Sequence, residues 1–134
     1  MATVKIVCGP PCVGKSTYVG QHAGPDDIVL DWDDIVTDLG YPPRHQFVNK
    51  SLVGIVTEEW RIRLAKATAT DRVVWVIRSQ SARQCAPLAR SLNAELIELS
   101  EPVPVLLERA AHRPHPEEHR RLSLAWHGTR RRRR

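Results

Sequence analysis

The sequence contains 134 residues, 42% hydrophobic and 26% charged, with a formal net charge of +5 at pH 7. This length suits one globular domain, and no apolar run is long enough to span a bilayer. The short apolar start does not match a signal peptide, so we expect a cytoplasmic protein with no membrane partner. The three cysteines, with no C-x-x-C spacing, indicate neither a disulfide framework nor a zinc site.

The first predicted strand, residues 3–8, leads directly into Gly-Pro-Pro-Cys-Val-Gly-Lys-Ser at residues 9–16. This is the pattern G-x-x-x-x-G-K-[ST], followed by a helix predicted over residues 15–22, and in this setting the pattern binds nucleoside triphosphates. The glycines let main-chain N–H groups approach phosphate oxygens, and the helix adds partial positive charge. We expect ATP or GTP with Mg²⁺, Lys15 on the β- and γ-phosphates and the Ser16 hydroxyl on the metal. The expected nucleotide-binding residues are Gly9, Pro10, Pro11, Cys12, Val13, Gly14, Lys15, Ser16 and Thr17.

A short buried strand over residues 28–30 precedes the aspartate-rich segment Asp31-Trp32-Asp33-Asp34. A carboxylate at the end of this strand would face the γ-phosphate and could accept a proton from an attacking hydroxyl. Asp33 is the first candidate for this base and Asp31 the second, and one of them could instead hold a magnesium-bound water. The competing interpretation is that Asp33 and Asp34 cap the next helix, which Gly40 would end. Trp32 could stack on a base or sugar, or could be a core residue at the sheet edge.

A long helix is predicted from about residue 44 to residue 69, because its apolar residues recur at three- and four-residue steps. Its expected core face consists of Phe47, Val48, Leu52, Ile55, Val56, Trp60 and Leu64. Residues 73–77 form a continuous β-branched apolar run, which is typical of a central parallel strand. Arg78, rather than an acidic residue, follows that strand, and this argues against a motor or an AAA-type ATPase.

The remaining elements are a helix over residues 81–92, opened by a capping box, a strand over residues 94–99, and a helix over residues 105–111 after Pro102 and Pro104. Residues 117–126 are predicted to resume a helix after a proline-broken segment.

Arg109 and Arg113 are four residues apart and so share a face of the late helix. Two arginines there could neutralise the transferring phosphate. The alternative is an exposed basic face without a catalytic role.

Strands that alternate with helices predict an α/β domain over residues 1–128: an open parallel sheet of about four strands with helices on both faces and a short helical lid. Because the carboxyl ends of parallel strands meet at one edge, the phosphate loop, the aspartates and Arg78 should converge. Residues 129–134 form a basic tail, which we expect to be disordered. Removing its five arginines leaves 15 basic residues against 15 acidic ones. Such a tail either contacts nucleic acid or is a solvated end without a role.

Three segments, residues 9–17, 30–34 and 103–113, together resemble P-loop kinases of the polynucleotide 5′-kinase and zeta-toxin type. The resemblance implies that the aspartate-rich segment carries the general base for a hydroxyl acceptor and that the late helix carries lid arginines. These roles fall on Asp33, and on Arg109 and Arg113. The compact, arginine-rich chain also resembles short ATP-binding proteins encoded by bacteriophages.

One feature departs from that family. Polynucleotide kinases usually have an arginine shortly after the aspartate, where it holds the acceptor's phosphate. This chain has Ile35, Val36 and Thr37 at those positions. Arg44 or Arg78 could substitute, which leaves the acceptor open.

The sequence therefore predicts an ATP-dependent kinase that phosphorylates a hydroxyl of a nucleic-acid 5′ end, a nucleoside or a nucleotide. Two alternatives stay open. The missing acceptor arginine also fits a module that binds ATP or GTP without turnover, and the resemblance also admits a zeta-toxin-like kinase of a sugar nucleotide. The oligomeric state is not predicted.

Overall fold

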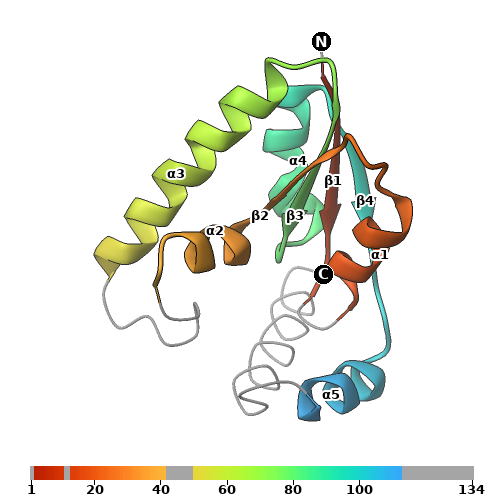
Figure 1. Ribbon diagram of the computed structural model, residues 1–134. Helices are drawn as coiled ribbons and strands as arrows, with labels where there is room; N and C mark the ends of the chain where they lie inside the picture. The colour runs from red at the N-terminus through yellow and green to blue at the C-terminus, as the bar shows by residue number, and fades with distance from the viewer. Residues whose placement is uncertain (1, 11–12, 42–49, 113–134) are drawn as a thin grey trace.

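The computed structural model describes residues 2–10, 13–41 and 50–112, in which strands alternate with helices (Figure 1). The strands in these residues are β1 (Thr3–Cys8), β2 (Ile28–Asp31), β3 (Val73–Arg78) and β4 (Glu95–Glu98). The helices in the same residues are α1 (Lys15–His22), α2 (Trp32–Asp38), α3 (Lys50–Thr68), α4 (Ala82–Leu92) and α5 (Val103–Ala111).

The four strands form one parallel sheet in the order β2-β3-β1-β4. Its register places Cys8, the last residue of β1, beside Arg78 of β3 and Glu98 of β4, and places Asp31 of β2 beside Ile77. The carboxyl ends of all four strands therefore meet at one edge. The structure confirms the predicted fold class, a single α/β domain with a four-stranded parallel sheet.

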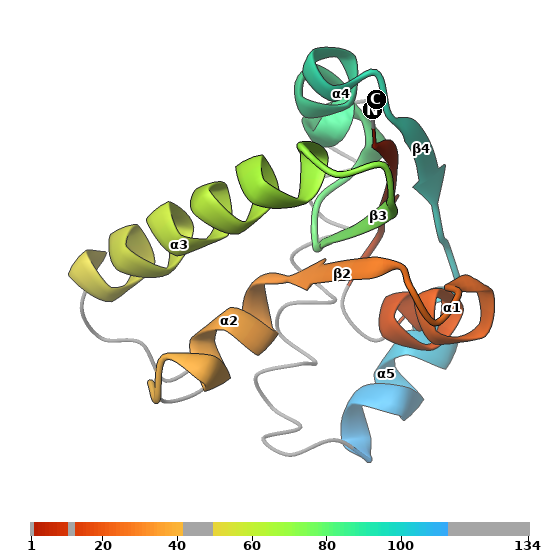
Figure 2. The same ribbon diagram turned by 45° about the horizontal axis from the view of Figure 1, so that its top comes forward.

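Helices cover both faces of the sheet, and each face has its own core (Figure 2). On one face, α2, α3 and α4 pack against alternate residues of the strands. The buried residues of this larger core include Ile6, Leu30, Val36, Val56, Trp60, Leu64, Val76 and Ala89. On the other face, Val19 of α1 packs with Val7, Trp75 and Ile77. Burial of the central strands on both faces agrees with their continuous apolar sequences.

Helix α5 lies beyond the carboxyl edge of the sheet, next to α1 (Figure 2). Its Leu106 packs with Val13 of the phosphate loop and with half-buried Leu99 in a third apolar cluster, which Leu99 joins to the core beside α1. The predicted late helix is therefore present in the described residues, and it contacts the loop; its role as a lid stays a prediction.

Most predicted elements are present, and the differences have local causes. Helix α5 begins at Val103 rather than at residue 105, because Pro104 fits within a first helical turn. The capping box before α4 is confirmed, since Ser81 and Gln84 bond reciprocally. The predicted start of the long helix at residues 44–49 and the predicted helix over residues 117–126 lie outside the described residues.

The predicted core face of α3 is correct at Val56, Trp60 and Leu64, but Ile55 is 48% exposed. Ile55 is one residue, about 100° of helical rotation, away from the buried stripe that Val56 begins. Among the described residues, we find no helix with the length and apolar character needed to cross a bilayer.

Candidate functional site

The phosphate loop connects β1 to α1 at the carboxyl edge of the sheet (Figure 1). Two of its glycines have backbone conformations that other residues rarely adopt, with φ of 151° at Gly9 and 97° at Gly14. A Cβ atom at Gly9 would also lie 2.6 Å from the carbonyl oxygen of Leu99. Glycine is therefore required by the shape of the loop. Pro11 and Cys12 lie outside the described residues, while Pro10 and Val13 are buried.

Lys15 is the first residue of α1, and its side chain turns back into the loop. Its ammonium donates hydrogen bonds to the carbonyl oxygens of Gly9 at 3.1 Å and Pro10 at 2.8 Å. Lys15 is only 8% exposed, and a buried ammonium needs such oxygen partners. Phosphate oxygens could take the place of these carbonyls. The residues at this site therefore fit a nucleoside triphosphate.

Ser16 and Thr17 follow Lys15 in the first turn of α1, and both are exposed. The N-terminus of α1 adds partial positive charge beside the loop, which favours an anion. The role of Ser16 as a ligand of Mg²⁺ stays a prediction.

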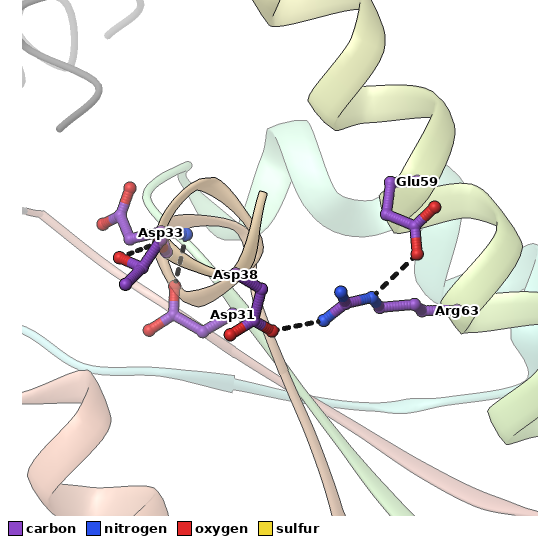
Figure 3. Close-up of polar contacts among 6 residues, drawn as sticks. Asp31, Asp33, Asp38, Glu59 and Arg63 are labelled. Carbon is purple, nitrogen blue, oxygen red and sulfur yellow. Dashed lines mark hydrogen bonds and ion pairs between the residues drawn. The ribbon is translucent and has the colours of Figure 1, made fainter. Parts of the chain in front are cut away.

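The aspartate-rich segment lies at the end of β2, and Figure 3 shows it with the ion pairs next to it. Asp31 is the N-cap of α2, because its Oδ1 accepts a hydrogen bond from the main-chain N–H of Asp33 at 3.1 Å. The alternative that Asp33 and Asp34 cap this helix is therefore wrong; both lie in its first turn. A cap must have extended backbone, which Asp31 has as the last residue of the strand. Asp33 and Asp34 are exposed.

The pKa of Asp31 is raised to about 6. Burial is the main cause, and the nearby charges of Asp33 and Asp34 add to it. The hydrogen bond from Asp33 and the positive charge of Lys15 act in the opposite direction. The register of the sheet places the end of β2 at the same edge as the end of β1, where the phosphate loop begins.

A cavity of about 300 Å³ lies next to Asp31, between β2, α2 and α3. Asp38 and Arg63, two of its lining residues, form an ion pair at 2.8 Å, and Arg63 also contacts Glu59 at 3.1 Å (Figure 3). These two carboxylates raise the pKa of Arg63. Asp38 and Arg63 are not among the site residues predicted from the sequence. Only the Glu59–Arg63 spacing gives a local signal, since Asp38 and Arg63 are far apart in the chain.

Trp32 is half-buried and packs against the larger core, which agrees with its interpretation as a core residue at the sheet edge. Arg78 ends β3, and its guanidinium carbon lies 4.8 Å from the centre of the Trp60 ring. Its Nη2 donates to Gln80 Oε1 at 3.3 Å. Arg78 is two residues after Val76, so both side chains lie on the face of the sheet that carries α3. Asp31 is the residue after Leu30, so it lies on the opposite face.

Arg109 of α5 reaches the phosphate loop, where its Nη1 donates to the carbonyl oxygen of Val13 at 3.2 Å. Its Nη2 lies 3.6 Å from Oε1 of Glu101. The structure therefore brings together the loop, Asp31 and Arg109, while it places Arg78 against α3. Arg44 and Arg113 lie outside the described residues.

Comparison with known proteins identifies a family and a shared fold. A family model described as an AAA domain (AAA_33) matches residues 4–133. A chain of a solved structure described as "Structure of the Pnkp1/Rnl/Hen1 RNA repair complex" shares the fold, with a TM-score of 0.71 and 13% sequence identity. The match covers 98% of this chain and 46% of that one, so this chain spans less than half of that relative. No curated protein matches.

The family match covers nearly the whole chain, and the solved structure shows the same fold. The sequence led us to expect a protein other than an AAA-type ATPase. The matching family is described as an AAA domain, so this expectation is corrected. The observation behind that expectation holds, since β3 ends on Arg78 and not on an acidic residue.

Proposed function

The chain belongs to the AAA_33 family of AAA domains, and we propose that it is an ATP-dependent kinase. We propose that it transfers the γ-phosphoryl group of ATP, or of GTP, to a hydroxyl group of a nucleic-acid 5′ end, a nucleoside or a nucleotide. A cytoplasmic location is part of this proposal, and the resemblance to short bacteriophage proteins stays a prediction.

The observation that carries the proposal is the convergence of three segments that are far apart in the sequence. The register of the sheet places the end of β2, and with it the aspartate-rich segment, at the same edge as the phosphate loop, and Arg109 bonds to the loop at Val13. A phosphate cradle, a carboxylate and a positive charge near the transferred phosphate are the parts that phosphoryl transfer to a hydroxyl requires. All three meet at the carboxyl edge of a parallel sheet, where such folds bind ligands.

Each residue then has a role. The main chain around Gly9 and Gly14 holds the phosphates, Lys15 neutralises the β- and γ-phosphates, and Ser16 holds Mg²⁺. Bound ATP and Mg²⁺ supply the phosphoryl group and the positive charge that shields it. Arg109 would exchange the carbonyl of Val13 for a phosphate oxygen, a short movement because Nη1 already touches the loop.

Asp33 is the proposed base. It is exposed, and in Figure 3 it lies on the side of α2 away from Arg63, so no ion pair in the described residues holds it there. Asp31 is occupied as the helix cap, which supports the choice of Asp33. The acceptor hydroxyl loses its proton to the Asp33 carboxylate while its oxygen bonds to the γ-phosphorus. The bond from that phosphorus to the bridging oxygen breaks, and ADP leaves.

The direct test is transfer from γ-labelled ATP to a panel of acceptors: 5′-hydroxyl DNA and RNA oligonucleotides, nucleosides, nucleotides and a sugar nucleotide. We expect a labelled product with at least one nucleic-acid or nucleoside acceptor, formed roughly 10²–10³ times more slowly with Lys15→Ala. Nucleotide binding by calorimetry without any product over hours would instead favour the binding module. A product with the sugar nucleotide alone would favour the zeta-toxin-like activity.

The basic tail offers a separate test of the nucleic-acid acceptor. Deletion of residues 130–134, which lie outside the described residues, removes five positive charges. Each charge on a phosphate releases counterions, so the deletion should weaken oligonucleotide binding and flatten its salt dependence. ATP affinity should not change. If the oligonucleotide affinity and its salt slope are the same with and without the tail, a small-molecule acceptor becomes the better proposal.

A further inference from the structure

The phosphate loop is packed against a leucine that lies far outside the nucleotide-binding motif. Leu106 of α5 is 0% exposed and Val13 of the loop is 6% exposed. They contact each other and half-buried Leu99, and this cluster shares no buried residue with the cores of the sheet. Leu106 therefore packs on the loop, while Leu99 joins this cluster to the core beside α1.

Polar contacts follow the same path from β4 to α5. The main-chain N–H of Leu99 donates to the carbonyl oxygen of Cys8 at 2.9 Å, immediately before the loop. At Gly9 the approach is so close that a Cβ would meet the Leu99 carbonyl oxygen at 2.6 Å. Arg109, three residues after Leu106, donates to Val13 at 3.2 Å. Leu99 thus contacts the start of the loop, and α5 contacts the loop at Val13.

We propose that Leu106 is a positioning residue for the phosphate loop: its side chain fixes Val13, and through it the loop backbone, in the conformation that binds nucleotide. This inference rests on the proposed nucleotide site. A loop already held in its binding conformation loses less conformational entropy when the ligand binds, so its affinity is higher. The same contact keeps α5 docked, with Arg109 one helical turn away over the loop.

Leu64 provides a matched control, because it is a buried leucine of α3 in the larger sheet core, 8% exposed. Leu106→Ala and Leu64→Ala make the same chemical change in two separate clusters. Two quantities are measured for each variant: the Kd of a non-hydrolysable ATP analogue by calorimetry, and the urea midpoint of unfolding by far-ultraviolet circular dichroism.

We expect Leu106→Ala to raise the Kd of the analogue about tenfold, equivalent to about 1.4 kcal/mol, with a smaller loss of urea midpoint than Leu64→Ala. Leu64→Ala should lower the midpoint and leave the Kd unchanged. The inference is overturned if Leu106→Ala binds the analogue like the wild type, or if Leu64→Ala weakens binding as much. If the wild-type chain itself binds no nucleotide, the proposed function fails and the inference fails with it.

Two more variants cover the case in which Leu106→Ala does not fold. Leu106→Met keeps the volume and should bind the analogue nearly as the wild type does. Val13→Ala removes the other side of the contact and should also raise the Kd, and the two alanine variants combined should raise it by less than the product of their separate effects. Independent, multiplicative effects of Val13→Ala and Leu106→Ala would show that the contact does not set the loop.

Discussion

The phosphate loop and the aspartate-rich segment lie at the same edge of the sheet, but they are built differently. The loop is packed from several sides. The buried Lys15 ammonium donates to the carbonyl oxygens of Gly9 and Pro10. Leu99 packs closely against Gly9, and Leu106 packs against Val13. The aspartate-rich segment follows the edge strand β2; Asp33 is exposed, and Asp31 and Asp34 line a cavity of about 300 Å³. The side that would hold the phosphate donor is therefore shaped by packing, whereas the side that would meet the hydroxyl acceptor is shaped by carboxylates in contact with solvent.

This contrast predicts that a substitution at Asp33 lowers the reaction rate without lowering the stability of the fold. Asp33→Asn removes the proposed base at an exposed site, so we expect turnover to fall by about 10²–10⁴. Stability and ATP affinity should stay near the wild type, because the Asp33 side chain is not the helix cap. Single-turnover transfer rates, calorimetric ATP affinity and thermal unfolding measure the three quantities.

Asp31→Asn is the matched variant, since asparagine also caps helices well. It should retain most of the activity. If Asp31→Asn abolishes turnover while Asp33→Asn retains it, the base is Asp31 and our assignment is wrong.

On the loop side, affinity, activity and stability should change together. Lys15→Ala removes a buried cation and leaves the carbonyls of Gly9 and Pro10 without this donor. We expect transfer to slow by roughly 10²–10³, as for the loss of one transition-state contact, with weaker ATP binding and about 1–2 kcal/mol less stability. The exposed Lys66→Ala controls for the loss of a positive charge. A Lys15→Ala chain with normal ATP affinity would contradict the role of Lys15 in the loop.

The sequence predicts the loop well because the information is local. Gly9, Gly14, Lys15 and Ser16 lie within one short segment, and the strand before it and the helix after it are equally clear. The apolar run at residues 73–77 is likewise enough to identify a strand buried on both faces.

The aspartate-rich segment was harder to predict, because Asp31, Asp33 and Asp34 are all good caps and differ by only one or two positions. Where β2 ends decides between them, and its last residue is fixed by pairing with β3. The Leu106–Val13 contact and the Asp38–Arg63 ion pair join distant parts of the chain. No local pattern encodes either contact, so only the tertiary structure reveals them.

The smallest predicted effect concerns the pH dependence of stability at Asp31. Its folded-state pKa is raised to about 6, above the value of about 3.9 in an unfolded chain. Between these two values the folded protein binds the proton more readily, so the ionised side chain costs stability above pH 6 and this cost disappears as the pH falls toward 4. Asp31 is only half-buried, so solvent screening limits the effect to about 1 kcal/mol.

Asp31→Asn removes this titration and keeps the cap. We therefore expect the variant to be more stable than the wild type at pH 7 and to lose that advantage by pH 4. Urea unfolding at half-unit steps between pH 4 and pH 7.5 measures the difference between the two chains, in which the contributions of all other carboxylates cancel. A constant difference across this range would mean that Asp31 titrates normally. Burial and the charges of Asp33 and Asp34 would then raise the pKa of Asp31 less than the structure indicates, or Lys15 would lower it more.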